Sequence, residues 1–362
     1  MKILLVEPAG KGGICQHAHN LANALAARNH EVTLATAVGF ETKEFPRSYQ
    51  AIEVFDRFRP HPLRILRFLL WIRAFRPDVV HIEAAVHPGG YFLIWKAVRA
   101  MVKCRFVYTA HDVVSKKSHS YHPWMLKQIY RGMDHIIVNA IRNKEEIVGQ
   151  FGATPNRVAF VPVGDLVAFV RDVPPGKLEG VPPGTGKILF FGNIEPRKGL
   201  MTLIRAFSGI VKEVPAAFLI IMGRPYEDVT PYQLEIQHLG LSDRVFFRPG
   251  YVPLDQISTI LTAADVVVLP YEKAWNSGII LSAYSYGKPV VATSVSGLSE
   301  AIEDGKTGFI VPPGDTGALQ TAISRILSDS SLREQMQKEA RKVAEMNSWA
   351  RIAEETERIY TE

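Results

Sequence analysis

The stretch that most constrains the fold is Asp265–Glu300, DVVVLPYEKAWNSGIILSAYSYGKPVVATSVSGLSE. Two apolar, β-branched runs within it, Asp265–Tyr271 and Pro289–Ser294, predict strands that are covered on both faces of a sheet. Between them, Ser277–Tyr286 predicts a helix opened by glycine. The loop after the first strand therefore lies at the carboxyl edge of a parallel sheet, where ligands of open α/β sheets bind. The helix start suits an anion such as a diphosphate, although an ordinary βαβ unit also has a tight loop here.

The same alternation of strand and helix continues along all 362 residues, a length that suits two domains. Strands are expected at Lys2–Pro8, Glu31–Ala37, Ala51–Phe58, Asp78–Glu83, Arg105–Asp112, His135–Ala140 and Arg157–Gly164, and again at Lys187–Asn193, Ala216–Gly223, Arg244–Gly250, Asp265–Tyr271, Pro289–Ser294 and Gly308–Pro313. The pattern predicts two Rossmann-like, doubly wound α/β domains that face each other across a cleft.

Domain boundaries follow from composition. Residues 165–186 are rich in proline and glycine and indicate a linker. We expect an N-terminal domain at 1–164, a C-terminal domain at 187–345, and a closing segment at 346–362 whose helix Trp349–Tyr360 has Ser348 as its N-cap.

Charge is unevenly distributed along the chain. The overall formal charge is +6, but residues 1–164 carry 22 Lys and Arg against 12 Asp and Glu. This basic half favours an anionic partner, or is simply a solvated surface. No nucleic-acid-reading motif accompanies it, so we expect no nucleic-acid partner. Cys15 and Cys104 form no disulfide framework, and no apolar run of about 18 residues appears, so the chain is expected to be cytoplasmic.

Basic and apolar residues are densest in Arg57–Arg76, RFRPHPLRILRFLLWIRAFR. Two interpretations remain open. The segment is a helix that packs on the sheet with its arginine stems along the surface, or it contacts an anionic membrane surface, which would place the protein peripherally on the inner face of the membrane.

Two further segments carry candidate chemistry. Arg197 and Lys198 follow a predicted strand and precede a helix, an arrangement that favours a phosphate site. His111 and Asp112 close the predicted strand YTAHDV and therefore point into the cleft, although a structural histidine is the ordinary alternative. A metal site is possible from His17 and His19 or from His111 and Asp112, but no H-x-x-x-H or cysteine-rich spacing supports it, so no metal site is expected.

Several motifs together resemble the retaining glycosyltransferases of group 1 and family four, which have the two-domain GT-B architecture. They are GKGGICQHAHNLANAL, PDVVH, TAHD, FGNIEPRKGL, AADVVVLPY, SGIILSAYSYGKPVVAT, SGLSE and DGKTGFIVPPGD. The resemblance covers essentially the whole chain, and its SG-containing loop is similar to a branch used in bacterial polysaccharide assembly. It implies a nucleotide-sugar donor bound by the C-terminal domain, a lipid-linked or saccharide acceptor bound by the N-terminal domain, and no cofactor or metal.

Individual roles are implied by the same resemblance. Lys198 matches the lysine that binds the diphosphate, Asn193 stands where the family has arginine, so that Arg197 substitutes for it, and His111 matches a histidine that contacts the donor sugar. The family's paired glutamates are missing. Ser282 occupies the second position, which leaves Glu272 or Glu300 as candidates for binding the ribose. The resemblance further assigns donor contacts to Gly12, Gly13, Met222, Gly223, Tyr251, Val252, Ser277, Gly278 and Ile279, and acceptor contacts to His17 and Asp112.

The sequence thus predicts transfer of a sugar from a nucleotide-diphosphate-sugar to an acceptor in cell-surface polysaccharide or glycolipid biosynthesis. A nucleotide-sugar epimerase on the same fold would need acid and base carboxylates that the sequence does not clearly supply. A non-catalytic nucleotide-sugar sensor is the third possibility, which the missing glutamate pair favours. Turnover of a labelled donor, and the identity of the product, distinguish the three.

Overall fold

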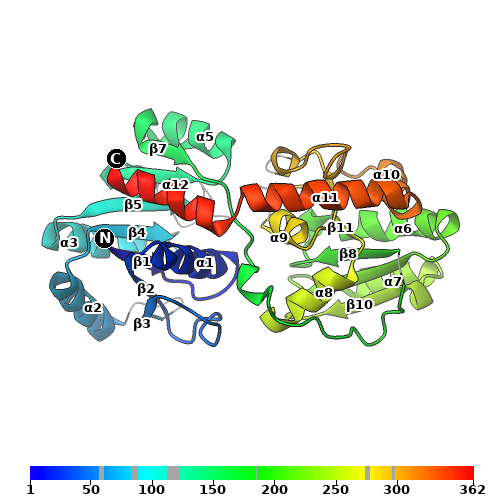
Figure 1. The fold of residues 1–362 in the computed structure, drawn as a ribbon, viewed down its shortest axis with the longest axis horizontal. Coiled ribbons are helices and arrows are strands. Elements are labelled where there is room, and N and C mark those ends of the chain that lie inside the picture. Colours follow the sequence, from blue (N-terminus) through cyan, green and yellow to red (C-terminus); the bar gives the residue numbers. More distant parts are fainter. Residues whose placement is uncertain (57–60, 84–87, 112–122, 185, 274–277, 296–297) are drawn as a thin grey trace. The chain divides into compact units, whose positions relative to one another are not determined.

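The computed structural model describes residues 1–56, 61–83, 88–111, 123–184, 186–273, 278–295 and 298–362 (Figure 1). The chain forms two compact units. Unit 1 comprises Met1–Leu166 and Asn347–Glu362, and unit 2 comprises Val167–Met346. Each unit is a parallel sheet covered by helices, which confirms the predicted fold class.

The sheet of unit 1 has the order β3-β2-β1-β4-β5-β6-β7, with parallel neighbours throughout. Its strands are β1 (Lys2–Glu7), β2 (Glu31–Ala37), β3 (Gln50–Phe55), β4 (Val79–Glu83), β5 (Arg105–Ala110), β6 (His135–Val138) and β7 (Val158–Phe160). The helices of this unit are α1 (Gly13–Ala27), α2 (Pro62–Phe75), α3 (Pro88–Met101), α4 (Pro123–Gly132), α5 (Ile141–Phe151) and α12 (Trp349–Thr361).

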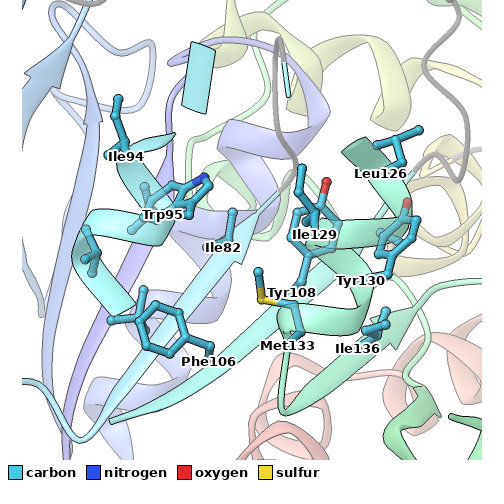
Figure 2. Packing of buried hydrophobic residues seen from close by; sticks show 14 of the residues in the cluster. Ile82, Ile94, Trp95, Phe106, Tyr108, Leu126, Ile129, Tyr130, Met133 and Ile136 are labelled. Atoms are coloured by element: carbon cyan, nitrogen blue, oxygen red, sulfur yellow. The ribbon is translucent and has the colours of Figure 1, made fainter. Parts of the chain in front are cut away.

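Apolar side chains cover both faces of this sheet. On one face, α2 to α5 pack over the strands, and Figure 2 shows Trp95 of α3 and Tyr130 of α4 beside Phe106 and Ile136 of the strands. On the other face, α1 and α12 share a core with β1 and β2 and lie side by side. This burial on both faces explains why the strands are almost continuously apolar.

In unit 2 the sheet has the order β10-β9-β8-β11-β12-β13, again with parallel neighbours. The strands are β8 (Lys187–Phe191), β9 (Phe218–Gly223), β10 (Val245–Pro249), β11 (Val266–Leu269), β12 (Val290–Thr293) and β13 (Gly308–Val311). The helices are α6 (Leu200–Glu213), α7 (Thr230–His238), α8 (Ile257–Ala263), α9 (Ile279–Ser285), α10 (Thr316–Ser328) and α11 (Ser330–Met346). The larger core of this unit lies between the sheet and α6, α7 and α10.

Strand order gives each sheet a point where the winding reverses. In unit 1 it lies between β1 and β4, and in unit 2 between β8 and β11. Ligands of open α/β sheets bind at the carboxyl ends of the strands at such a point. The residues that follow these four strands are therefore expected to form the binding sites.

The predicted linker and closing helix both pack onto the units. From Val167 onward the linker belongs to unit 2, where Val173 accepts a hydrogen bond from Ser258 and Gly176 donates one to Thr259. Helix α12 belongs to unit 1 and begins after Ser348, whose side chain makes no capping hydrogen bond within the described chain.

Several predicted strands extend too far. Arg157–Gly164 shrinks to β7, and β5 ends at Ala110, so that His111 follows its strand instead of ending it. The predicted ends of two strands, Phe58 and Asp112, lie outside the described residues. The predicted helix Ser277–Tyr286 is observed as α9, which begins at Ile279. Beyond β7, the amide of Val161 still donates to Val138 at 3.0 Å, but Pro162 has no amide to donate and the ladder stops there.

Candidate functional site

Arg197 and Lys198 form a tight turn at the reversal point of unit 2. They belong to a 3-10 turn, Pro196–Lys198, between β8 and α6. Gly199 closes this turn with φ +65°, and a Cβ there would collide with the backbone oxygen of Pro270. Glycine is therefore required both for its backbone conformation and for the close approach of the turn to the end of β11.

Hydrogen bonds join this turn to the segment after β11. The backbone oxygen of Arg197 accepts from the amide of Glu272 at 2.8 Å. The ammonium of Lys198 lies 3.6 Å from the centre of the Tyr271 ring, a cation–π distance. The turn after β8 and the loop after β11 are thus held together at the reversal point.

The two cations are not equivalent. Arg197 donates two hydrogen bonds to the carboxylate of Glu195, at 2.6 and 3.1 Å, and its charge is therefore already paired. The sequence treats Arg197 and Lys198 alike, because it does not show that Glu195 folds back onto Arg197. Lys198 is engaged differently, with the face of the Tyr271 ring, and both residues are candidates for binding a phosphate.

The other predicted donor residues of unit 2 lie along the same carboxyl edge. Asn193 follows β8, Met222 and Gly223 end β9, Tyr251 and Val252 follow β10, Glu272 follows β11, Gly278 and Ile279 begin α9, and Glu300 follows β12. Gly223 has φ +154°, and a Cβ on it would collide with the backbone oxygen of Gly192, so the ends of β8 and β9 are in close contact.

Three of the predicted substrate-binding residues have another outcome. Ser277 and Asp112 lie outside the described residues. Ser282 is buried in α9, and its hydroxyl donates to the backbone oxygen of Gly278 at 3.1 Å, so it serves the helix in this structure. Glu272 and Glu300 are both exposed and remain candidates for the ribose.

At the reversal point of unit 1, Glu7 organises the glycine-rich turn. Its carboxylate accepts hydrogen bonds from the amides of Ala9 and Gly10, at 2.9 and 2.8 Å, and from Thr36 at 3.1 Å. Burial raises the pKa of Glu7 to about 7. The next glycine, Gly12, caps α1 and donates to Glu41 at 2.7 Å, so the turn before Gly13 is held by two carboxylates.

Glu83, the last residue of β4, is the centre of a group of histidines. Its carboxylate lies 2.7 Å from His111 Nε2, 3.3 Å from His17 Nδ1 and 3.5 Å from His81 Nε2. Glu83, His17 and His81 are buried, and His111 is only slightly exposed. The structure therefore brings together His17 and His111, which were predicted to contact different substrates.

The charges in this group can be assigned from their surroundings. Burial raises the pKa of the Glu83 carboxyl, but His17, His81 and the hydrogen bond from His111 more than offset it, so that this pKa lies well below its ordinary value. Burial lowers the pKa of His17 and lowers that of His81 to about 4, despite the nearby carboxylate. With the pKa values of His17 and His81 lowered, the hydrogen bond from His111 is the contact that stabilises the Glu83 carboxylate when these two imidazoles are neutral.

Helix α12 forms one wall of this group. The hydroxyl of Tyr360 lies 2.6 Å from His81 Nδ1, and the Trp349 ring meets the edge of His17 with 5.0 Å between ring centres. Trp349 also donates to the backbone oxygen of Asp165 at 2.7 Å. The end of the chain therefore fixes the orientation of His17 and His81.

Glu7, His81 and Glu83 are site residues that the sequence motifs do not indicate. The available signal was chemical: a glutamate ends each of the buried strands β1 and β4, and a buried carboxylate needs partners. Several of those partners come from elsewhere in the chain and no local pattern names them: Thr36 of β2 for Glu7, and His17 of α1 and His111 after β5 for Glu83.

Comparison with known proteins agrees with this architecture. Residues 11–164 match the family model described as Glycosyltransferase Family 4, and residues 178–343 match the model Glycosyl transferases group 1. An uncharacterized glycosyltransferase of Methanocaldococcus jannaschii is 28% identical, over 99% of this chain and 98% of its own.

Two solved structures share the fold. Anabaena HepE in complex with UDP superposes with a TM-score of 0.77 at 18% identity, covering 100% of both chains. WaaG, a glycosyltransferase involved in lipopolysaccharide biosynthesis, superposes with a TM-score of 0.66 at 17% identity, covering 99% of each chain.

Proposed function

Because this chain belongs to the glycosyltransferases of group 1 and family four, which have the GT-B fold, we propose that it moves a sugar from a nucleotide-diphosphate-sugar to a lipid-linked or saccharide acceptor. Transfer retains the configuration of the anomeric carbon and needs no resident metal. The likeness to WaaG, which is involved in lipopolysaccharide biosynthesis, supports a role in assembling a cell-surface polysaccharide or glycolipid.

One observation carries the proposal: the Arg197–Lys198 turn lies at the reversal point of the unit 2 sheet, bonded to the loop after β11. An anionic diphosphate there meets the ammonium of Lys198 and the N-terminal end of α6. During transfer, negative charge grows on the leaving diphosphate. Fixed positive charge and aligned N–H groups stabilise that charge without reorganisation, which lowers the barrier.

Unit 1 supplies the second part of the proposal. His111 positions the donor sugar, and Glu83 holds its imidazole by the 2.7 Å hydrogen bond. The acceptor binds to unit 1 with His17 near it, and the Gly12–Gly13 turn contacts the donor. Positioning of this kind can account for several kcal/mol of a barrier, because reacting atoms must lie within about 3–3.5 Å.

Replacing the cations of the turn tests the donor site. Lys198→Ala should weaken binding of the matching nucleoside diphosphate by about 1.5–3 kcal/mol, the scale of a hydrogen bond to a charged group. Arg197→Ala should cost less, because Glu195 already pairs its charge. Calorimetric titration with UDP, GDP and ADP measures both effects and identifies the base.

The matched control is the double variant Arg205→Ala with Lys212→Ala. It also removes one arginine and one lysine, but from exposed positions further along α6. Unchanged nucleotide affinity in the Arg197→Ala, Lys198→Ala double variant would remove the diphosphate site from this turn. Incubation of the wild type with radiolabelled nucleotide-sugars then separates transfer from binding alone, and the product separates transfer from epimerisation.

The third part of the proposal concerns a membrane-near acceptor. Helix α2 buries Phe68 and Ile72 against the sheet but exposes Leu63, Leu66 and Leu70, and Arg73 continues the same stripe at helical spacing. An exposed apolar stripe with cations suits the interface of an anionic bilayer. Every helix among the described residues is too short or too polar to span a bilayer.

A further inference from the structure

His17, Glu83 and His111 have the ligand chemistry of a transition-metal site, and we call them the His–Glu–His cluster. Each offers one ligand atom, and the three atoms all lie within 4.8 Å of one another. Two imidazoles and one carboxylate form the ligand set of many zinc sites that keep a fourth position open. His17 lies on α1 and Glu83 ends β4, so regular elements hold these two, and His111 directly follows β5.

The spacing of the ligand atoms is close to what Zn²⁺ needs. With bonds of about 2.0–2.1 Å, tetrahedral ligands lie roughly 3.3 Å from one another. His17 Nδ1 is already 3.3 Å from the nearer Glu83 oxygen. His111 Nε2, at 2.7 Å from the same oxygen, would exchange its hydrogen bond for a metal bond after a small outward shift.

Unsatisfied polar atoms at this place point to a missing partner. Within the described chain, His17 Nδ1 and Glu83 Oε1 are buried and form no hydrogen bond. Buried polar atoms are almost always paired, so such atoms mark a position for a water molecule or an ion. Glu83 Oε1 lies beside His81 Nε2 at 3.5 Å, whereas the oxygen near His17 and His111 is Oε2. His17 Nδ1 is therefore the unpaired atom that a cation beside Oε2 would satisfy.

Supporting contacts around the cluster resemble those that orient metal ligands. Behind Glu83, His81 bonds to Tyr360 and Thr109, at 2.6 and 2.7 Å. His17 packs edge-on against both His111 and Trp349, with 4.7 and 5.0 Å between ring centres. Contacts of this kind fix ring orientation and tune metal affinity.

We propose that the His–Glu–His cluster binds one divalent transition-metal ion, of which Zn²⁺ and Co²⁺ are suitable probes. The site does not depend on the proposed sugar transfer. If that proposal also holds, a bound metal withdraws His111 from the sugar, so that the ion acts as an inhibitor of transfer.

The test uses the full chain, stripped of metal with a chelator and titrated with Co²⁺ and then Zn²⁺. We expect one equivalent of Co²⁺ to give the visible absorption of a low-symmetry, four- or five-coordinate site, and Zn²⁺ to displace it. His17→Ala should weaken binding by more than about a hundredfold, because loss of a ligand costs more than the 10–100-fold loss seen for outer-sphere residues. Glu83→Gln should do the same.

The matched control is His135→Ala, a unit 1 histidine at the start of β6, away from the cluster. Circular dichroism and thermal unfolding report whether each variant folds. If Glu83→Gln does not fold, His17→Ala decides, because Glu83 then keeps its hydrogen bond from His111. The proposal fails if the wild type binds no stoichiometric Co²⁺, or if His17→Ala binds as tightly as His135→Ala.

Discussion

At the scale of single residues, one carboxylate sets the chemistry of unit 1. Glu83 is buried, ionised and in contact with three imidazoles, and His111 is the least buried of these partners. A buried charge is tolerated only when it is paired or hydrogen-bonded. The geometry therefore fixes the His111 ring before any substrate arrives, which is what a positioning role requires.

His111→Ala should lower kcat strongly, while the affinity for nucleoside diphosphate stays within about twofold, because the variant loses an interaction with the sugar and none with the diphosphate. Steady-state kinetics and nucleotide titration on the same preparation measure the two quantities. His111→Asn, which keeps a donor for Glu83, should recover folding stability better than it recovers kcat. Near-normal turnover in His111→Ala would instead show that this histidine is structural.

At the scale of elements, the sequence predicts strands and helices well because their signals are local. The apolar runs of β8, β9, β11 and β12 follow from burial on both sheet faces. The Arg197–Lys198 turn was predictable for the same reason, since its strand, its glycine and its helix are neighbours in the chain.

What escaped prediction depends on order within the sheet. Glu83 meets His111 because β4 lies beside β5, and it meets His17 because α1 follows β1 on the other side of β4. The sequence pattern names the strands but not their neighbours. The ion pair of Arg197 with Glu195 was not predicted for another reason. The two residues are close in sequence, but residue type alone does not show which way their side chains point.

Helix α2 provides a test at this scale. Leu66 and Leu70 are 54% and 59% exposed, so serine at both positions should leave the fold intact. Binding to anionic vesicles should fall by about tenfold or more, because burying a leucine side chain is worth about 1.5–3 kcal/mol and interfacial contact gains part of it. Co-sedimentation with vesicles that contain phosphatidylglycerol measures the change.

Leu234→Ser is the control for α2, because Leu234 is 59% exposed on α7 of unit 2. Arg67→Gln with Arg73→Gln tests the electrostatic part. It should cost about 2 kcal/mol at low salt, at roughly 1 kcal/mol for each cation near an anionic surface, and less at high salt. Equal binding of the wild type to neutral and anionic vesicles would argue against this surface.

At the scale of the whole molecule, the two units differ in charge and in ionisable groups. Residues 1–164 are strongly basic, and ten of the 11 histidines lie there. Unit 1 also contains the buried carboxylates Glu7 and Glu83, whose pKa values move in opposite directions. Acid and base should therefore affect the stability of unit 1 more than that of unit 2.

Glu7 gives this difference a defined sign. Its folded pKa of about 7 lies above the ordinary value of 4.5, so the native state holds a proton that the unfolded chain has lost between these pH values. Its contribution to stability is complete below pH 4.5 and is lost as the pH rises through 7. A difference of about 2.5 pKa units amounts to roughly 3 kcal/mol.

Glu7→Gln removes this titration and isolates it from every other group. We expect the wild type to gain stability relative to Glu7→Gln as the pH falls from 8 to 5, by up to about 3 kcal/mol, because only the wild type takes up the proton. Denaturant unfolding at several pH values gives the difference, and hydrogen exchange assigns it to unit 1. A difference that stays constant across this range, or that grows towards high pH, would mean that Glu7 is ionised in the native state and that the amides of Ala9 and Gly10 stabilise its charge more than burial opposes it.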